Sequence, residues 1–274
     1  MIRFAYYEPT SLAEAVQLLG RHKGSASVLA GGTDLLVELK EHLRRAAHVV
    51  NIKRIPGMSE LSFDPKNGLK IGALVTAREI EVNADVAKHY PGLLQSVREL
   101  GSIQVRNRAT VVGNICRASP SADTLPPLIA DGAMLKTSER TIALESFFTG
   151  PGKTLLEPDE IVTGIEIPAP APRTGKVYIK HGRRKAMELA TVGVAVSVSP
   201  DETRIVLGAV APTPIRARKA EAIFTQSKNS NEAAEAAMDE ARPISNVRAT
   251  ADYRREMVKV LTRRALELAL ERSK

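Results

Sequence analysis

A proline-rich segment past the middle of the chain separates two regions of different pattern. The run PAPAPRTG occupies residues 168–175, and a run of this composition is extended and joins separately folded units. At roughly 150 residues per domain, the 274 residues correspond to about two domains. We therefore predict a first domain over residues 1–170 and a second over residues 171–274.

The first domain opens with strands and helices in alternation. Ser11 and Glu14 have the spacing of a capping box, in which a hydroxyl cap and a carboxylate three residues later close the start of a helix. Hydrophobic spacing and glycines then predict a helix over 11–22, a strand over 27–30, a helix over 33–45 and a strand over 48–52. This β-α-β pattern defines a first subdomain, residues 1–56.

The rest of the first domain, residues 57–170, is a second subdomain of mixed pattern. We expect a strand over residues 69–74, a second capping box over residues 76–79 that opens a short helix, and a helix that starts at Pro91. Short strands separated by Gly and Pro are expected through residues 110–167.

The second domain combines strands and helices in sequence. Residues 176–179, 190–198 and 203–211 are strand-like, and the chain is helical from about Arg216, with a long amphipathic helix over residues 251–272. The fold class that follows for the whole chain is α+β.

Two segments carry residues suited to a phosphorylated ligand. The glycine corner, LAGGTDLL at residues 29–36, joins a strand to a helix through Gly31 and Gly32. Glycine lets backbone amides approach a ligand closely, and a helix start presents unpaired N–H groups. The polar segment, residues 108–123, gathers hydroxyls, an amide and a carboxylate suited to sugar hydroxyls and a diphosphate. The alternative for the glycine corner is a tight turn without a ligand, and the alternative for the polar segment is an ordinary surface loop.

Composition excludes several classes of function. The net charge of +8 permits an anionic partner, but aromatic residues make up only 4%, with no Trp, too few for the stacking platforms of nucleic-acid-binding modules. The single cysteine, Cys116, cannot hold an iron–sulfur cluster or a multi-thiolate zinc site. The five histidines lack metal-ligand spacing, so no metal site is expected and no catalytic residue is assigned.

Other motifs are also missing from the sequence. No GxGxxG follows a strand, and Gly152-Lys153-Thr154 lacks the earlier glycine of a phosphate-binding Walker loop. The chain shows no signal-peptide pattern and no run of about 18 apolar residues. We therefore expect a soluble cytoplasmic protein without a membrane span.

The two segments together resemble the FAD-binding medium subunit of the molybdenum hydroxylases, the family of xanthine and carbon monoxide dehydrogenases. LLEPDEIVTGIEIP at residues 155–168 and KHGRRKAMELATVGVAV at residues 180–196 look like later landmarks of that family, in the same order. The resemblance covers the whole chain. It implies a FAD-binding domain of two α/β subdomains (PCMH/VAO-type), and a C-terminal domain of a small antiparallel sheet and a helical bundle.

The resemblance also implies a set of cofactor contacts. The positions that match FAD-binding residues of the family are Val28, Leu29, Ala30, Gly31, Gly32, Thr33, Asp34, Leu35, Leu100, Thr110, Val111, Val112, Gly113, Asn114, Asp123, Val162 and Lys180. Under it, the amides of the glycine corner hold the diphosphate, the polar segment lines its other side, and Asp123 accepts a bond from a cofactor hydroxyl. Leu100, Val162 and Lys180 border the cofactor.

Val112 departs from the family pattern, which has paired glycines at this point. A valine disfavours positive φ and adds bulk. We expect its backbone to stay in the β region with the side chain pointing away, so that FAD affinity is preserved.

The function implied by the resemblance is electron transfer. A large subunit would carry the molybdenum–pterin centre, a small subunit two [2Fe–2S] clusters, and this chain would pass their electrons from FAD to an acceptor such as NAD or a quinone, in a hetero-oligomer. The single cysteine of this chain is consistent with iron–sulfur clusters held by another subunit, because a cluster needs several cysteine ligands. The alternatives are a free-standing FAD-dependent NAD(P)H reductase, similar to the enolpyruvyl-glucosamine reductases, and a non-catalytic assembly or scaffold protein.

Overall fold

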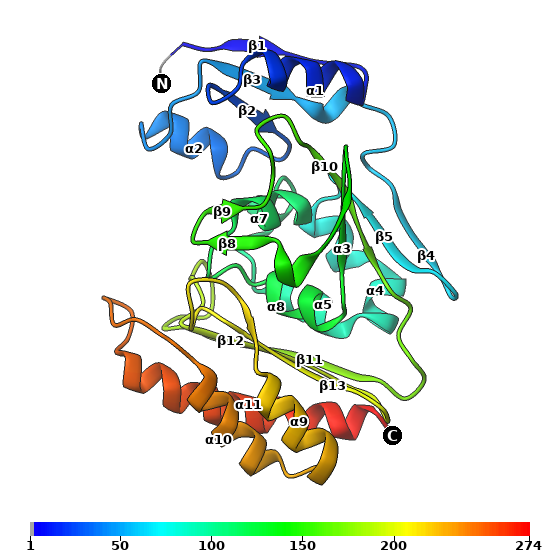
Figure 1. Ribbon diagram of the computed structural model, residues 1–274, viewed down its shortest axis with the longest axis vertical. Helices are drawn as coiled ribbons and strands as arrows, with labels where there is room; N and C mark the ends of the chain where they lie inside the picture. Colours follow the sequence, from blue (N-terminus) through cyan, green and yellow to red (C-terminus); the bar gives the residue numbers. More distant parts are fainter. Residues whose placement is uncertain (1–2) are drawn as a thin grey trace.

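The computed structural model describes residues 3–274, which form three stacked layers (Figure 1). The upper layer is a parallel sheet of order β1-β3-β2. Its elements are β1 (Ala5–Tyr7), α1 (Leu12–Arg21), β2 (Ala26–Leu29), α2 (Leu35–Lys40), β3 (His48–Asn51) and the 3-10 turn η1 (Ile52–Arg54). The predicted alternation of strands and helices is confirmed.

Helix α2 ends at Lys40, five residues before the predicted end. His42 adopts a positive φ of 60°, and the amides of Leu43 and Arg44 return to the carbonyl oxygen of Glu38. Leu43 is 79% exposed. A longer helix would therefore bury no further apolar surface, and burial of one apolar face is what stabilises most short helices.

The two predicted capping boxes differ in the structure. At Thr76 the box is complete, because the Thr76 hydroxyl accepts from the Glu79 amide and the Glu79 carboxylate accepts from the Thr76 amide. At Ser11 the hydroxyl accepts from the Glu14 amide, 3.2 Å, but the carboxylate accepts from the amide of Thr10, 2.9 Å. In the first box, the hydrogen bond to the carboxylate therefore comes from the residue before the cap instead of from the cap itself.

The middle layer is an antiparallel sheet of order β4-β5-β10-β6-β7, covered by short helices. The strands are β4 (Leu61–Asp64), β5 (Gly68–Gly72), β6 (Met134–Thr137), β7 (Thr141–Ala143) and β10 (Val162–Ile167), with a separate pair β8 (Phe148–Gly150) and β9 (Lys153–Thr154). The helices are α3 (Ala77–Val82), α4 (Ala84–His89), α5 (Pro91–Arg98), α6 (Ile103–Arg106), α7 (Val111–Arg117), α8 (Leu125–Ala130) and the 3-10 turn η2 (Leu144–Ser146).

The prediction of strands from residue 110 onward is wrong for the first part of that range. Residues 111–117 form α7, whose N-cap Thr110 accepts a hydrogen bond from the amide of Gly113, 3.0 Å. Val111, Val112 and Ile115 are buried on one side of the helix. A β-branched run has strand propensity, but the cap and the burial of this face favour a helix.

The expectation for Val112 is corrected by the same helix. Its backbone is helical rather than extended. Its side chain is 4% exposed and belongs to the main hydrophobic core. The valine therefore contributes to packing.

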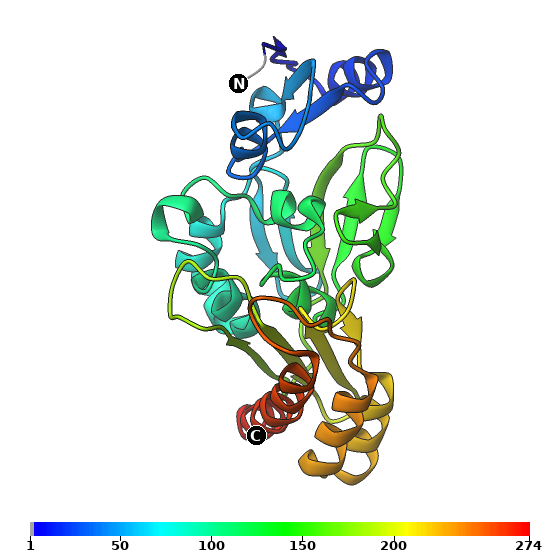
Figure 2. The ribbon, with the colours of Figure 1, turned by 90° about the vertical axis from the view of Figure 1, so that its left-hand side faces the viewer.

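The lower layer is an antiparallel sheet of order β11-β12-β13-β14 with three helices on its outer face (Figure 2). Its elements are β11 (Gly175–His181), β12 (Val192–Val198), β13 (Thr203–Gly208), β14 (Ile215–Arg216), α9 (Arg218–Ser227), α10 (Ser230–Glu240) and α11 (Ala251–Arg272). The inner face packs on α5 and α8 of the middle layer. The α+β fold class and the long C-terminal helix are confirmed.

Candidate functional site

The glycine corner lies against the start of the polar segment. A Cβ at Gly31 would collide with the carbonyl oxygen of Arg108 and would approach Ala109 Cα to 3.1 Å. Gly32 has a φ of +79°, which side chains other than glycine rarely adopt. Both glycines are therefore required here, one by close backbone contact and one by conformation.

The backbone amides of the glycine corner are available to a ligand. Among residues 3–274, the N–H groups of Gly31, Gly32 and Thr33 donate no hydrogen bond to another backbone group. They lie at the turn from β2 into α2, where unpaired donors carry partial positive charge. Three successive free N–H donors form an anion-binding site.

A pocket of about 200 Å³ opens beside this corner. Its lining residues come from all the segments that meet there: Ala30, Gly31, Lys53, Ser59, Leu74, Thr76, Asn107, Arg108 and Thr110. Gly31 of the glycine corner and Thr110 of the polar segment both line this pocket. Thr110 is fixed by a β-bridge to Thr76.

Two cations of this pocket, Lys53 and Arg108, are absent from the predicted FAD contacts, although Arg108 begins the polar segment. Burial and the charge of Arg108 lower the pKa of the Lys53 ammonium, while Glu8 raises it. The Lys53 ammonium donates to Asn51 Oδ1, 3.1 Å. Lys53 lies in the 3-10 turn that follows β3, and Arg108 lies between α6 and Thr110. The position of Arg108 beside Thr110 in the polar segment is the sequence signal that could have identified it.

The remaining residues of the polar segment are partly engaged within the protein. The Gly113 amide is used by the Thr110 cap, and the Asn114 Oδ1 accepts from the Thr124 hydroxyl, 2.6 Å. Val111 donates its amide to the carbonyl of Val75, 3.2 Å. These bonds fix the start of α7 against the middle sheet.

Asp123 is the centre of a buried polar cluster. Its Oδ1 accepts from the Tyr178 hydroxyl, 2.8 Å, and its Oδ2 pairs with the Lys180 ammonium, 2.9 Å. Lys180 also donates to the carbonyls of Glu99, 3.0 Å, and Glu188, 2.7 Å. Burial raises the pKa of Asp123 to about 6, although Lys180 and Tyr178 favour its ionised form. Sequence reasoning named Asp123 and Lys180 but missed Tyr178.

The other predicted contacts occupy different environments. Leu29 and Leu35 are buried in a small core cluster beneath the upper sheet, Ala30 lines the pocket, and Val28 and Asp34 are exposed. Leu100 is buried beside Glu99. Val162 lies within the main core on β10. The structure thus brings Gly31 and Thr110 into one pocket, and Asp123 and Lys180 into one cluster.

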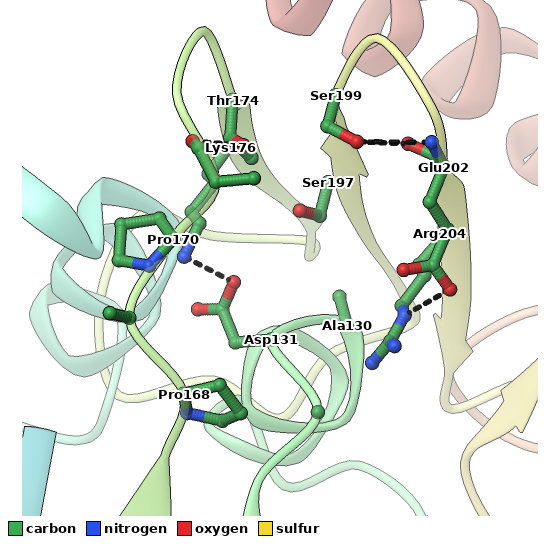
Figure 3. Close-up of a pocket in the computed structure, with 13 residues that line it drawn as sticks. Ala130, Asp131, Pro168, Pro170, Thr174, Lys176, Ser197, Ser199, Glu202 and Arg204 are labelled. Carbon is green, nitrogen blue, oxygen red and sulfur yellow. Dashed lines mark hydrogen bonds and ion pairs between the residues drawn. The ribbon is translucent and has the colours of Figure 1, made fainter. Parts of the chain in front are cut away.

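A second pocket of about 250 Å³ lies between α8, the proline segment and the lower sheet (Figure 3). Its charged side chains pair with one another: Lys176 with Asp131, 2.8 Å, and Arg204 with Glu202, 2.7 Å. Asp131 and Lys176 are almost fully buried. This pocket is a polar space between the middle and lower layers, and the charges of the side chains that line it are balanced.

Comparison with known proteins identifies the class of this chain. Residues 2–170 match the family described as FAD binding domain in molybdopterin dehydrogenase, and residues 177–269 match the CO dehydrogenase flavoprotein C-terminal domain. The chain belongs to this family of FAD-binding subunits of molybdenum hydroxylases. Membership favours the electron-transfer function over the free-standing reductase and the scaffold protein.

Individual relatives align with this chain over nearly their whole length. The chain is 31% identical to the xanthine dehydrogenase FAD-binding subunit of Escherichia coli O157:H7, over 98% of this chain and 97% of that one. It is 33% identical to the carbon monoxide dehydrogenase medium chain of Hydrogenophaga pseudoflava, over 98% of both. The solved structure of that dehydrogenase superposes with a TM-score of 0.94, covering 99% of both chains at 33% identity.

The residues present fit FAD. A dinucleotide diphosphate needs close donors and positive charge, and the glycine corner supplies free amides at a point where a Cβ has no room. Lys53 and Arg108 supply the charge. Among the residues described, no helix is long and apolar enough to span a membrane.

Proposed function

We propose that this chain is the electron-exit subunit of a molybdenum hydroxylase complex and that the pocket beside the glycine corner holds the FAD diphosphate. The free amides of Gly31, Gly32 and Thr33 are the observation that carries this assignment. Lys53 and Arg108 would neutralise the two phosphate charges.

The remaining cofactor contacts that we propose are those implied by the family resemblance. Thr110 and Asn114 line the opposite side of the diphosphate and the ribityl chain, and Asp123 accepts a bond from a cofactor hydroxyl. Leu100, Val162 and Lys180 border the cofactor, with Lys180 delivered from β11 of the lower sheet. When bound, FAD accepts electrons singly or in pairs, chemistry that no side chain supplies.

The partners proposed are a small subunit with two [2Fe–2S] clusters and a large subunit with the molybdenum–pterin centre. A chain with one cysteine depends on other chains for its clusters, and relatives are subunits of xanthine and carbon monoxide dehydrogenases. The acceptor is NAD or a quinone, and the location is the cytoplasm. We also propose a domain boundary near residue 170, supported by the break between the two family matches.

The test is FAD binding by the purified full chain and its glycine variants. The wild-type chain should bind FAD with a flavin absorption spectrum and should hydroxylate no organic substrate without its partners. Gly31→Ala should weaken FAD binding by about 100-fold or more. The new Cβ forces the glycine corner to move, so that two of its amides no longer donate to the diphosphate. Titration monitored by flavin fluorescence measures this.

Gly150→Ala is the matched control, because its new Cβ would meet only Lys153 Cδ at 3.8 Å. If Gly31→Ala fails to fold, Lys53→Met provides the second variant and should weaken binding about 10-fold. Unchanged FAD affinity in both Gly31→Ala and Lys53→Met would contradict the proposed site.

A further inference from the structure

Strand β11 presents three polar side chains to the middle layer. Lys176, Tyr178 and Lys180 alternate along the strand and therefore share one face. Lys176 pairs with Asp131, which follows α8, and Lys180 pairs with Asp123, which precedes it. Helix α8 is thus fixed at both ends to the same strand by buried ion pairs.

Tyr178 lies between these two ion pairs and is held in place from several sides. The residue is 5% exposed, and its backbone amide donates to Gln95 Oε1 on α5, 2.8 Å. On β12, a Cβ at Gly193 would lie only 2.9 Å from the Tyr178 hydroxyl oxygen. The absence of a side chain at Gly193 leaves the room in which the hydroxyl reaches Asp123.

The consequence for Asp123 is a carboxylate with both oxygens occupied before any ligand arrives. The Tyr178 hydroxyl fixes Oδ1 and the Lys180 ammonium fixes Oδ2. Burial and the charge of Asp123 raise the pKa of Tyr178 well above its usual value, so the phenol remains a donor at every physiological pH. A carboxylate fixed in this way presents its remaining lone pairs in one orientation.

We propose that Tyr178 is a positioning residue for FAD, whose hydroxyl keeps Asp123 ionised and oriented as the acceptor for a cofactor hydroxyl. Through Tyr178 and Lys180 the lower sheet then controls the pH at which the middle layer releases FAD. This inference rests on the proposed function, because it takes Asp123 as a cofactor contact.

The charged groups around Asp123 define the direction of the pH effect. Lys180 and Tyr178 on β11 favour the ionised carboxylate, and Glu99 at the end of α5 opposes it. Glu188 of the β11–β12 hairpin lies within ion-pair distance of Arg183 and Arg184, 3.7 and 3.5 Å. Removing the Tyr178 hydroxyl removes one bond to the ionised form, so the pKa of Asp123 rises and FAD weakens at a higher pH.

The experiment measures FAD affinity of the full chain from pH 5 to pH 8. Wild-type affinity should fall as the pH drops through the pKa of Asp123, about 6. In Tyr178→Phe the midpoint should move up by about one pH unit, which lowers affinity by about 5-fold at pH 6 and by about 10-fold at pH 5. Asp123→Asn should remove this pH dependence.

Lys176→Gln is the matched control, because it breaks the equivalent ion pair on the same strand face without touching Asp123. It should lower stability and leave the pH midpoint of FAD binding unchanged. Gly193→Ala, whose new Cβ pushes the Tyr178 hydroxyl away, should reproduce the shift of Tyr178→Phe. If Tyr178→Phe does not fold, Gly193→Ala tests the role of the Tyr178 hydroxyl in its place.

Two failures are distinguishable. Wild-type chain that binds no FAD at any pH contradicts the proposed function. Normal wild-type binding combined with an unshifted midpoint in Tyr178→Phe or Gly193→Ala, or with an equal shift in Lys176→Gln, overturns the role of Tyr178 alone.

Discussion

At the scale of single residues, small side chains decide where two backbones can meet. Gly31 touches the main chain of Arg108, and Gly193 makes room for the Tyr178 hydroxyl. Val112 shows the opposite case, because a bulky side chain at a position where relatives were expected to have glycine is accommodated in the core. At Val112, a valine can therefore replace the expected glycine without obstructing the cofactor, because its side chain points into the core.

Val112→Gly should separate these two roles. The variant should lose about 2–4 kcal/mol of unfolding free energy, because it removes a buried side chain and places glycine inside a helix. Its FAD affinity should remain close to wild type, because the valine points into the core. Urea denaturation and FAD titration measure the two effects, and a large gain in FAD affinity would show that Val112 obstructs the cofactor.

At the scale of elements, short helices in this protein depend on their caps and on one buried face. Helix α3 begins at a complete capping box, α7 begins at the Thr110 hydroxyl, and α2 ends where apolar burial ends. Helices of six or seven residues are too short to be stable alone. Each is therefore held by a few specific contacts whose loss has local consequences.

Thr110→Val tests this dependence for α7. It keeps the shape of the side chain but removes the acceptor for the Gly113 amide, so stability should fall by about 1 kcal/mol. FAD affinity should fall as well, because Thr110 lines the pocket. Thr110→Ser, which retains the hydroxyl, is the control and should keep most of both properties; equal losses in the two variants would argue against the cap.

At the scale of the whole molecule, the three layers are joined by packing and by buried charge. The inner face of the lower sheet contributes Tyr178, Ala195 and Val206 to the main core of the middle layer. The pairs Lys176–Asp131 and Lys180–Asp123 cross the same boundary. The middle and lower layers should therefore unfold together.

Lys176→Gln should lower the unfolding free energy of the full chain by about 3 kcal/mol, because it leaves the buried Asp131 carboxylate without its counter-ion. Circular dichroism and intrinsic tyrosine fluorescence should report one coincident urea transition. Two separate transitions in the wild-type chain would show that the layers are energetically independent. Lys136→Gln, which breaks an exposed pair with Glu166, is the control and should cost less than about 1 kcal/mol.

Features that depend on near neighbours along the chain could be predicted from the sequence alone. The Thr76 capping box, strands β11, β12 and β13 of the lower sheet, the long helix over residues 251–272 and the glycine corner all follow from local spacing and backbone freedom. The structure decided what depends on distant contacts. Residues 111–117 became a helix because their apolar face is buried. Lys53 and Arg108 meet in the pocket because the upper and middle layers pack there, and Tyr178 reaches Asp123 because the lower sheet packs on the middle layer. Local propensity is a property of a segment, whereas burial and charge pairing depend on what the folded chain brings beside it.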